Sequence, residues 1–443
     1  MKIYWPTIRM IDRFTRCRFA IPLCLFALYA ASALDGMAAT PLFRDFMGVN
    51  GHTVQFRPEL YQPVASLARD YHPVEWDLGK ETDFVTKFPL ARNGVDWSSV
   101  YGSWKKAGWR VDVSLMFESI PREKWKDLAA DARKYGERFA RAFGPSSKLA
   151  LVESVEIGNE PGKWSDADYR VMFENMARGL RAGDPKLKIA TCALVTGRSH
   201  DYAKSVDCIA GLETLYDVLN VHSYPELKGW PTWERSFLED PRLKKFVGDI
   251  TDLCKWRDEH AHGKEVWLTE FGYDATTKKP DPKTEFKDWI GVTDEQQAVW
   301  LARSWLLFAT LPIDRAYLYF FNDSDQPQVH GSSGLTRNFQ PKPAFWAAAH
   351  LQKALGNFRF AQKLTSAGTT IEEFVEIQGG TNRVWVVWLP TGEGRAGKIS
   401  LPQLPGRIVR AERLALRAND ENVLPVTGTD WEVSDRPIFL FLQ

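Results

Sequence analysis

The chain has 443 residues, 44% of them hydrophobic and 13% aromatic, which is enough to bury a large core and excludes a disordered protein. Its 57 lysines and arginines nearly balance its 56 aspartates and glutamates, which excludes the strongly basic charge typical of proteins that bind nucleic acid. We therefore expect an uncharged partner, and the 18 tryptophans offer flat apolar faces that suit sugar rings as well as core packing.

The first 39 residues differ in composition from the rest of the chain. Basic residues precede an apolar run at residues 19–33, and small residues follow it. This order is typical of a secretory signal peptide and predicts a secreted or periplasmic protein. The run is about fifteen residues long, which is short of the ~20 that cross a bilayer as a helix. The alternative is an uncleaved anchor, which would be the route to any membrane association.

Cleavage of this segment would leave three cysteines, Cys192, Cys208 and Cys254. Their odd number and irregular spacing predict neither a disulfide framework nor a zinc site. We expect them to be buried as small hydrophobic residues.

From about residue 44 onward, short apolar or β-branched runs alternate with segments of helical period, which is typical of a parallel sheet with crossover helices. The runs lie at residues 47–50, 64–71, 110–117, 152–158, 187–194, 217–222, 265–269 and 315–321. Eight is the number of strands in a (β/α)8 barrel. The second run is the least regular, because Pro63 and Pro73 disfavour a central strand position.

Helix signals lie between these runs. Ser165 can cap a helix at residues 166–181, Thr293 and Gln296 match a capping box, and Pro121 is expected to begin a helix that runs to about residue 143. After a last helix at residues 344–355, only strand-like runs separated by turn residues remain. The sequence therefore predicts an α/β fold, with a (β/α)8 TIM barrel at residues 40–356 followed by a small antiparallel, sandwich-like β-domain at residues 357–443.

Two glutamates directly follow predicted strands. Glu160 follows the fourth strand in the sequence Asn-Glu-Pro, and Glu270 follows the seventh in the sequence Thr-Glu-Phe-Gly. They lie 110 residues apart (270 − 160), about three βα units, and the C-terminal strand ends of a barrel share one rim. Hydrolysis of a glycosidic bond requires two facing carboxyl groups, one to protonate the departing oxygen and one to attack or stabilise the oxocarbenium-like carbon.

The two motifs resemble the paired signatures of glycoside hydrolase clan A, whose members are retaining (β/α)8 enzymes. The resemblance spans about residues 44–355, and within the clan the sequence is most similar to family 39. It implies that Glu160 is the acid/base, that Glu270 is the nucleophile, and that Asn159 binds the sugar hydroxyl beside the reacting carbon. The implied partner is a β-linked glycan.

His222 and Tyr224 follow the sixth predicted strand and are similar to the His-x-Tyr found there in many clan members. We expect the Tyr224 hydroxyl to hydrogen-bond the nucleophile and help keep it ionised, whereas His222 either holds the acid/base or contacts the sugar. The two glutamates need different protonation states at one pH, so Glu270 is expected to be charged and Glu160 protonated when the reaction begins.

Other predicted strand ends carry further candidates for contacts to the sugar. They are Asn50 after strand one, Arg69 and His72 near strand two, and Asn322 after strand eight. Trp164 and Trp230 follow strands four and six, and for each of them both sugar stacking and ordinary packing remain open. Many clan members place a tryptophan after strand eight, and here we expect Phe321 to replace it.

The sequence contains neither a glycine-rich phosphate loop nor a His-Glu-x-x-His motif, so we predict no cofactor and no metal site. A different class of function is a non-catalytic carbohydrate-binding or scaffold protein on the same barrel. Loss of one glutamate would be the expected mark of such a protein, and the presence of both favours an enzyme.

Overall fold

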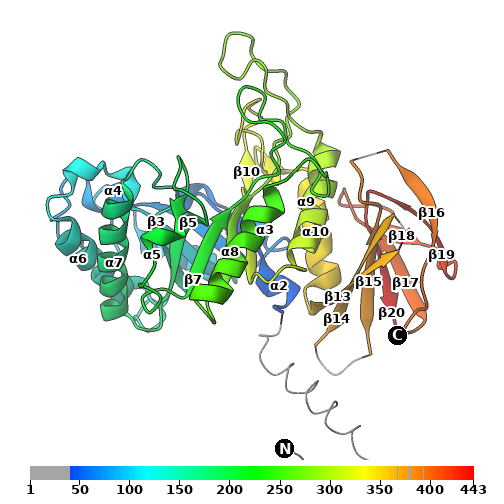
Figure 1. The fold of residues 1–443 in the computed structure, drawn as a ribbon, viewed down its shortest axis with the longest axis horizontal. Coiled ribbons are helices and arrows are strands. Elements are labelled where there is room, and N and C mark those ends of the chain that lie inside the picture. The colour runs from blue at the N-terminus through cyan, green and yellow to red at the C-terminus, as the bar shows by residue number, and fades with distance from the viewer. Residues whose placement is uncertain (1–39, 367, 378–380, 393) are drawn as a thin grey trace, which may run out of the picture. The chain divides into compact units, whose positions relative to one another are not determined.

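Eight parallel strands form a closed barrel in the computed structural model, which describes residues 40–443 except 367, 378–380 and 393 (Figure 1). Each strand pairs with the next along the chain, and the last pairs with the first. The strands are β1 (Met47–Asn50), β2 (Leu67–Pro73), β3 (Arg110–Met116), β4 (Ser154–Ile157), β5 (Lys188–Val195), β7 (Val218–His222), β8 (Glu265–Phe271) and β9 (Arg315–Leu318). The predicted fold class and all eight strand positions are confirmed. The predicted signal segment lies outside the described residues.

The barrel strands are buried along almost their whole length, because side chains fill the interior and helices cover the outside. One interior cluster consists of Leu67, Ala190, Val218, Trp267 and Tyr317. Gly48 on β1 makes room for this cluster, since a Cβ atom there would lie 2.4 Å from the Tyr317 ring. The interior is therefore a packed core and not a pore.

Helices follow most of the strands. They are α2 (Phe43–Phe46), α3 (Pro58–Tyr61), α4 (Val74–Leu78), α5 (Trp97–Lys106), α6 (Leu128–Phe143), α7 (Asp166–Gly183), α8 (Phe246–His260), α9 (Asp294–Phe308) and α10 (Pro343–Leu355). The predicted caps of α7 by Ser165 and of α9 by Thr293 and Gln296 are confirmed. Within the described residues, no helix is long and apolar enough to span a bilayer.

One local prediction is wrong. Helix α6 does not begin at Pro121 but at Leu128, because the Asp127 side chain accepts the N–H of Ala130 and caps the helix there. In the connection from β5 to β7, the described residues form no α-helix but only β6 (Lys204–Ser205) and a short 3₁₀ turn at Val206–Cys208. The three cysteines are free and buried, as predicted.

The C-terminal strands, orange to red in Figure 1, form antiparallel sheets, which confirms the predicted β-domain. One sheet has the order β13-β14-β15-β20-β17-β18, and a second pairs β16 with β19. The bounds are β13 (Phe358–Ser366), β14 (Thr369–Glu376), β15 (Arg383–Trp388), β16 (Ala396–Ser400), β17 (Ile408–Arg413), β18 (Val423–Leu424), β19 (Asp430–Ser434) and β20 (Ile438–Leu442). Residues 40–443 pack as one compact unit, so the division at residue 357 stays a prediction.

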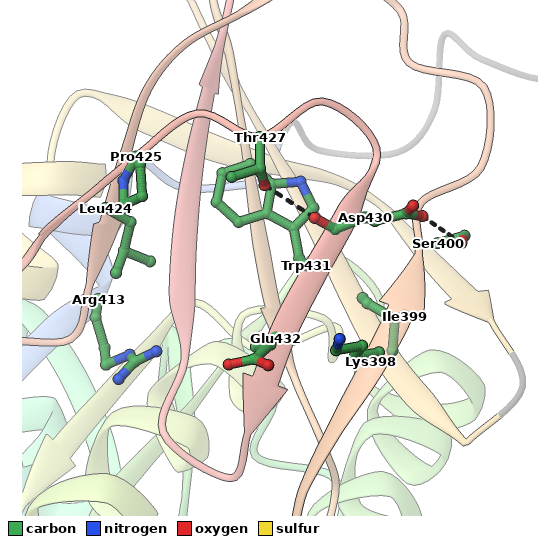
Figure 2. A pocket seen from close by; sticks show the side chains of 10 residues that line it. All are labelled: Lys398, Ile399, Ser400, Arg413, Leu424, Pro425, Thr427, Asp430, Trp431 and Glu432. Carbon is green, nitrogen blue, oxygen red and sulfur yellow. Dashed lines mark hydrogen bonds between the residues drawn. The ribbon is translucent and has the colours of Figure 1, made fainter.

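A cavity of about 580 Å³ opens among β16, β17, β18 and β19 (Figure 2). Trp431 and Ile399 line it together with the charged side chains of Lys398, Arg413 and Glu432. None of the residues that line it belongs to a barrel strand, so this cavity is separate from the two glutamates.

Three short strands follow the barrel strand β9. They are β10 (Asn322–Asp323), β11 (Thr336–Arg337) and β12 (Gln340–Pro341), and they form a small sheet of their own. The buried Lys342 ammonium binds Asp323 at 3.1 Å and the Ser332 carbonyl oxygen at 3.1 Å. These contacts fix the loop that connects β9 to α10.

Candidate active site

The two glutamates meet at the C-terminal ends of β4 and β8, the fourth and seventh strands of the barrel. Glu160 follows β4, Glu270 lies at the end of β8, and His222 ends β7 between them. One carboxylate oxygen of each glutamate and a ring nitrogen of His222 all lie within 4.8 Å of one another. The side chain of Glu160 is 35% exposed, whereas that of Glu270 is 6% exposed and that of His222 is 1% exposed.

Glu270 is surrounded by groups that favour its ionised form. The Tyr71 hydroxyl donates to Oε1 at 2.6 Å, and the Tyr224 hydroxyl donates to Oε2 at 2.8 Å. Arg69 lies 3.3 Å from Oε1, and His222 Nδ1 lies 3.6 Å from Oε2. Burial opposes ionisation, but the charges of His222 and Arg69 and the two tyrosine hydrogen bonds outweigh it and lower the pKa of Glu270. Glu270 is therefore a carboxylate near neutral pH.

His222 lies between the two carboxyl groups. Its Nδ1 is 2.9 Å from Oε1 of Glu160, so the structure places it against the predicted acid/base. Burial favours the neutral ring, but the Glu270 charge and the hydrogen bond to Glu160 prevail and raise the pKa of His222. A protonated His222 would therefore attract the carboxyl groups of both glutamates.

Arg69 on β2 connects four other site residues. It binds Glu156 on β4 through two bonds of 2.8 and 2.7 Å, Asn159 at 2.8 Å, Asn50 at 2.8 Å and Glu270 at 3.3 Å. These five bonds use all five N–H groups of the guanidinium. Because the side chain is fully buried, its position and those of its partners are fixed together.

Asn50 ties the same hydrogen-bond network to two barrel strands. Its Nδ2 donates to the carbonyl oxygens of Thr269 at 2.8 Å and Leu318 at 3.1 Å, which lie on β8 and β9. Asn50 and Arg69 are thus brought to the site, as predicted for their positions, but both are buried and bind protein groups. Their contacts are those of residues that hold the site together.

Tyr71 and Glu118 belong to the site, and the sequence analysis did not single them out. Tyr71 lies two residues after Arg69 on β2, so both side chains point to the same side of the strand. Glu118 follows β3, and its Oε1 accepts the backbone N–H groups of Asn159 at 2.7 Å and Glu160 at 3.1 Å. Burial is the main cause that raises the pKa of Glu118 to about 7, and the charge of Glu160 adds to it.

Aromatic rings border the carboxyl groups. The Tyr319 ring, directly after β9, lies 6.1 Å from the Tyr71 ring and 5.2 Å from the His330 ring. The His330 ring is also 4.9 Å from the Tyr224 ring. Tyr319 is therefore the aromatic residue after the eighth barrel strand that reaches the site, and the prediction that Phe321 takes this place is wrong. Phe321 is fully buried and packs against Phe56 and Tyr61.

Three other predicted contact residues do not reach the cleft. His72 is fully buried and lies 2.7 Å from both the Tyr101 hydroxyl and Asp77. Trp164 is buried with its ring 4.8 Å from the ring of Phe117. Of the two alternatives for this residue, sugar stacking and ordinary packing, its contacts are those of ordinary packing. Asn322 accepts hydrogen bonds through Oδ1 from the Phe339 N–H and the Thr336 hydroxyl and supports the β10–β11 loop. The contacts of these three side chains are therefore made within the protein and not in the cleft.

Trp230 differs from these residues because its side chain is exposed. The residue is 72% exposed and lies in the segment between β7 and α8. Among the described residues, no hydrogen bond or ring contact joins it to either glutamate, so stacking on a more distant sugar stays a prediction for it.

Glu160, His222 and Glu270 are also the one group of ligand-type side chains, among the described residues, that is close enough to hold a metal ion. The Arg69 guanidinium lies 3.3 Å from Glu270 and would repel a cation there. Both oxygens of Glu270 already accept hydrogen bonds from tyrosine hydroxyls. The arrangement fits proton transfer and nucleophilic attack better than metal binding.

Replacing Tyr71 by phenylalanine is expected to move the acidic limb of the pH profile of kcat/KM to higher pH, by about one unit or less. The Tyr71 hydrogen bond stabilises the ionised form of Glu270, so its loss raises the pKa of the group that must be ionised. Tyr224→Phe is the matched variant, since it removes the donor to the other oxygen. The measurement is kcat/KM against pH for both variants, and unchanged acidic limbs in both would contradict this account of Glu270.

The fold and site together define a (β/α)8 barrel with paired glutamates at the ends of its fourth and seventh strands. No protein-family model matches the chain, and no curated protein matches it in a sequence search. Solved structures match it across nearly its whole length, and several of them are glycoside hydrolases of families 39, 51 and 30, which belong to clan A. The fold resemblance predicted from the sequence is therefore confirmed.

Three of these structures illustrate the likeness. A family 39 glycoside hydrolase from the gut symbiont Bacteroides cellulosilyticus WH2 has a TM-score of 0.66 and 17% identity, over 90% of this chain and 80% of that one. A glucosidase from Croceicoccus marinus has a TM-score of 0.61 and 14% identity, over 92% and 98%. A family 51 arabinofuranosidase from Xanthomonas axonopodis pv. citri has a TM-score of 0.59 and 12% identity, over 92% and 98%. At these identities the comparison shows a shared fold.

Proposed function

We propose that this protein is a retaining glycoside hydrolase that cleaves β-linked glycans by double displacement, with Glu160 as acid/base and Glu270 as nucleophile. The observation that carries the proposal is that one oxygen of the Glu160 carboxyl group lies within 4.8 Å of one oxygen of the Glu270 carboxyl group. Retaining enzymes hold these groups about 5–5.5 Å apart, whereas inverting enzymes leave about 6.5–9.5 Å for a water molecule. The matching structures include glycosidases, which agrees with this class of reaction.

In the first step, a Glu270 oxygen forms a bond to the anomeric carbon while the bond from that carbon to the leaving oxygen breaks. Glu160 gives its proton to the leaving oxygen, so the aglycone departs as an alcohol. The ionised state of Glu270 supports its role as the nucleophile, and the partial exposure of Glu160 leaves this side chain accessible to the leaving group. Tyr71 and Tyr224 hold the attacking carboxylate by its two oxygens.

In the second step, Glu160 takes a proton from water, the water oxygen bonds to the anomeric carbon, and Glu270 leaves as a carboxylate. The formation of the glycosyl ester removes the negative charge of Glu270, which lets Glu160 act as a base. His222, 2.9 Å from Glu160, orients this side chain in both steps. We assign Asn159 to the hydroxyl beside the anomeric carbon, because Arg69 holds its Oδ1 and so fixes the amide.

We also propose that the enzyme acts in the periplasm or outside the cell, on the basis of the signal-like composition of residues 1–39. The sugar and linkage are to be identified with a panel of nitrophenyl β-glycosides and soluble β-glycans.

The stereochemistry of the first product tests the proposal. With the best substrate of the panel, proton NMR is expected to detect the β-anomer of the released sugar first and the α-anomer only as mutarotation proceeds. Initial release of the α-anomer would contradict double displacement. Binding of glycans without turnover of any of them would instead favour the non-catalytic carbohydrate-binding protein.

A further inference from the structure

The loop that carries Glu160 is held from two sides by buried polar side chains. On one side, Glu118 Oε1 accepts the N–H groups of Asn159 and Glu160. On the other side, the Lys204 ammonium, whose side chain is 1% exposed, donates to the carbonyl oxygens of Gly162 and Trp164. A carboxyl group thus binds the N–H groups of the loop, and an ammonium group binds its carbonyl groups.

The loop also has no room to shift toward the segment that carries Lys204. A Cβ atom at Gly162 would lie 1.8 Å from the carbonyl oxygen of Asp201, which shows how closely the two backbones approach. On the opposite side, movement of Glu160 would break the two bonds to Glu118. The Glu118 contacts are the ones that restrain the backbone of Asn159 and Glu160 directly, whereas Lys204 holds Gly162 and Trp164.

The second oxygen of Glu118 has no bond that offsets its burial. Oε2 is buried and has no hydrogen-bond partner in the described part of the chain. A buried polar atom without a partner costs free energy, so the burial of this carboxyl group opposes stability, while its other oxygen holds the backbone of Asn159 and Glu160. The charge of Glu160 raises the pKa of Glu118 further.

We propose that Glu118 is a positioning residue for proton transfer: by binding the backbone of Asn159 and Glu160 it sets the distance and direction from which Glu160 protonates the leaving group. This inference rests on the proposed function. An error of about 1 Å in the placement of a reacting group can cost on the order of a hundredfold in rate. The cost falls on leaving groups that need protonation, because an acidic phenol departs without help from an acid.

The dependence on the leaving group separates positioning from a general structural role. Two aryl β-glycosides of the sugar chosen from the panel serve as probes, one releasing phenol and the other 2,4-dinitrophenol. For Glu118→Ala we expect kcat/KM to fall about 10- to 100-fold with the phenyl glycoside and less than about threefold with the dinitrophenyl glycoside. Glu118→Gln keeps an acceptor oxygen for both N–H groups and is expected to recover most of the phenyl glycoside activity.

Asp184 provides a matched control. It is also a buried carboxylate that accepts two backbone N–H groups, from Ser146 at 2.6 Å and Lys186 at 3.0 Å, but it lies at the end of α7 away from the cleft. Asp184→Ala is expected to lower the thermal midpoint while leaving the ratio of the two kcat/KM values unchanged. The thermal midpoints of the Glu118 variants are measured alongside.

Equal losses on both substrates in Glu118→Ala and Glu118→Gln, or no loss in either variant, would overturn the positioning role. Failure of the proposed function has a different signature. In that case Glu160→Ala would hydrolyse the phenyl glycoside as fast as the wild-type protein, and the inference about Glu118 would fall with it.

Discussion

Glu270→Ala is expected to lower kcat/KM on an activated aryl glycoside by about a thousandfold or more, because it removes the carboxylate that we propose forms the glycosyl ester. The small cavity left by the substitution lies where Tyr71, Tyr224 and Arg69 converge. Azide can enter it, attack the anomeric carbon directly, and restore part of the turnover. The product is then a glycosyl azide of inverted, α configuration, which NMR identifies.

Glu160→Ala is the matched variant, and azide should act on it differently. We expect a loss of about 10²- to 10⁴-fold on substrates with poor leaving groups. With an activated substrate the glycosyl ester on Glu270 still forms, and azide then attacks this ester to give a glycosyl azide of retained, β configuration. If both variants kept wild-type rates, or if azide gave the same product with both, the two roles would be wrong.

The second large effect concerns stability. Arg69→Met is expected to lower the free energy of unfolding by about 3–5 kcal/mol, because it leaves the fully buried Glu156 carboxylate without its partner. It also releases Asn159, Asn50 and Glu270, so kcat/KM should fall as well. Guanidinium chloride unfolding monitored by tryptophan fluorescence measures the stability, and the steady-state rate measures the activity.

Adding Glu156→Gln to Arg69→Met tests the reason for this loss. The glutamine carries no charge, so the double variant is expected to be more stable than Arg69→Met alone while remaining almost inactive. If the double variant were no more stable than the single one, the loss would come from packing and not from the isolated charge.

Most of the barrel could be predicted from the sequence, because most of its strands are short, mainly apolar runs that are buried on both faces. Strand β2 is more polar, and its Pro73 lies at the last position, where a missing N–H is tolerated. The start of α6 could not be predicted in the same way, because Pro121 and Asp127 both give helix-start signals and only the structure shows which one caps. Likewise, the absence of a helix between β5 and β7 has no simple sequence signal.

The site was predicted in part. The two glutamates, His222 and Tyr224 lie at or just after strand ends, and these positions identify them. Tyr71 contacts a group 199 residues away in the chain, and such a contact depends on how the barrel closes. The expected strand at residues 315–321 ends at Leu318, so Tyr319 is the first residue beyond it, where Phe321 was expected. A shift of a few residues at one strand end thus changes which ring reaches the substrate.

The contacts of helix α9 with the C-terminal sheets bear on how this protein was inherited. Arg303 binds Glu239, which lies in the segment after His222 and Tyr224, and also donates to the Thr391 carbonyl oxygen at 2.7 Å. Trp388 on β15 donates to the same glutamate at 2.8 Å. Recombination that exchanged the sheets for another module would remove the Thr391 contact of Arg303 and the Trp388 contact of Glu239, and would loosen the segment that follows His222. Barrel and sheets are therefore expected to descend together as one evolutionary unit, unlike accessory modules that pass freely between enzymes.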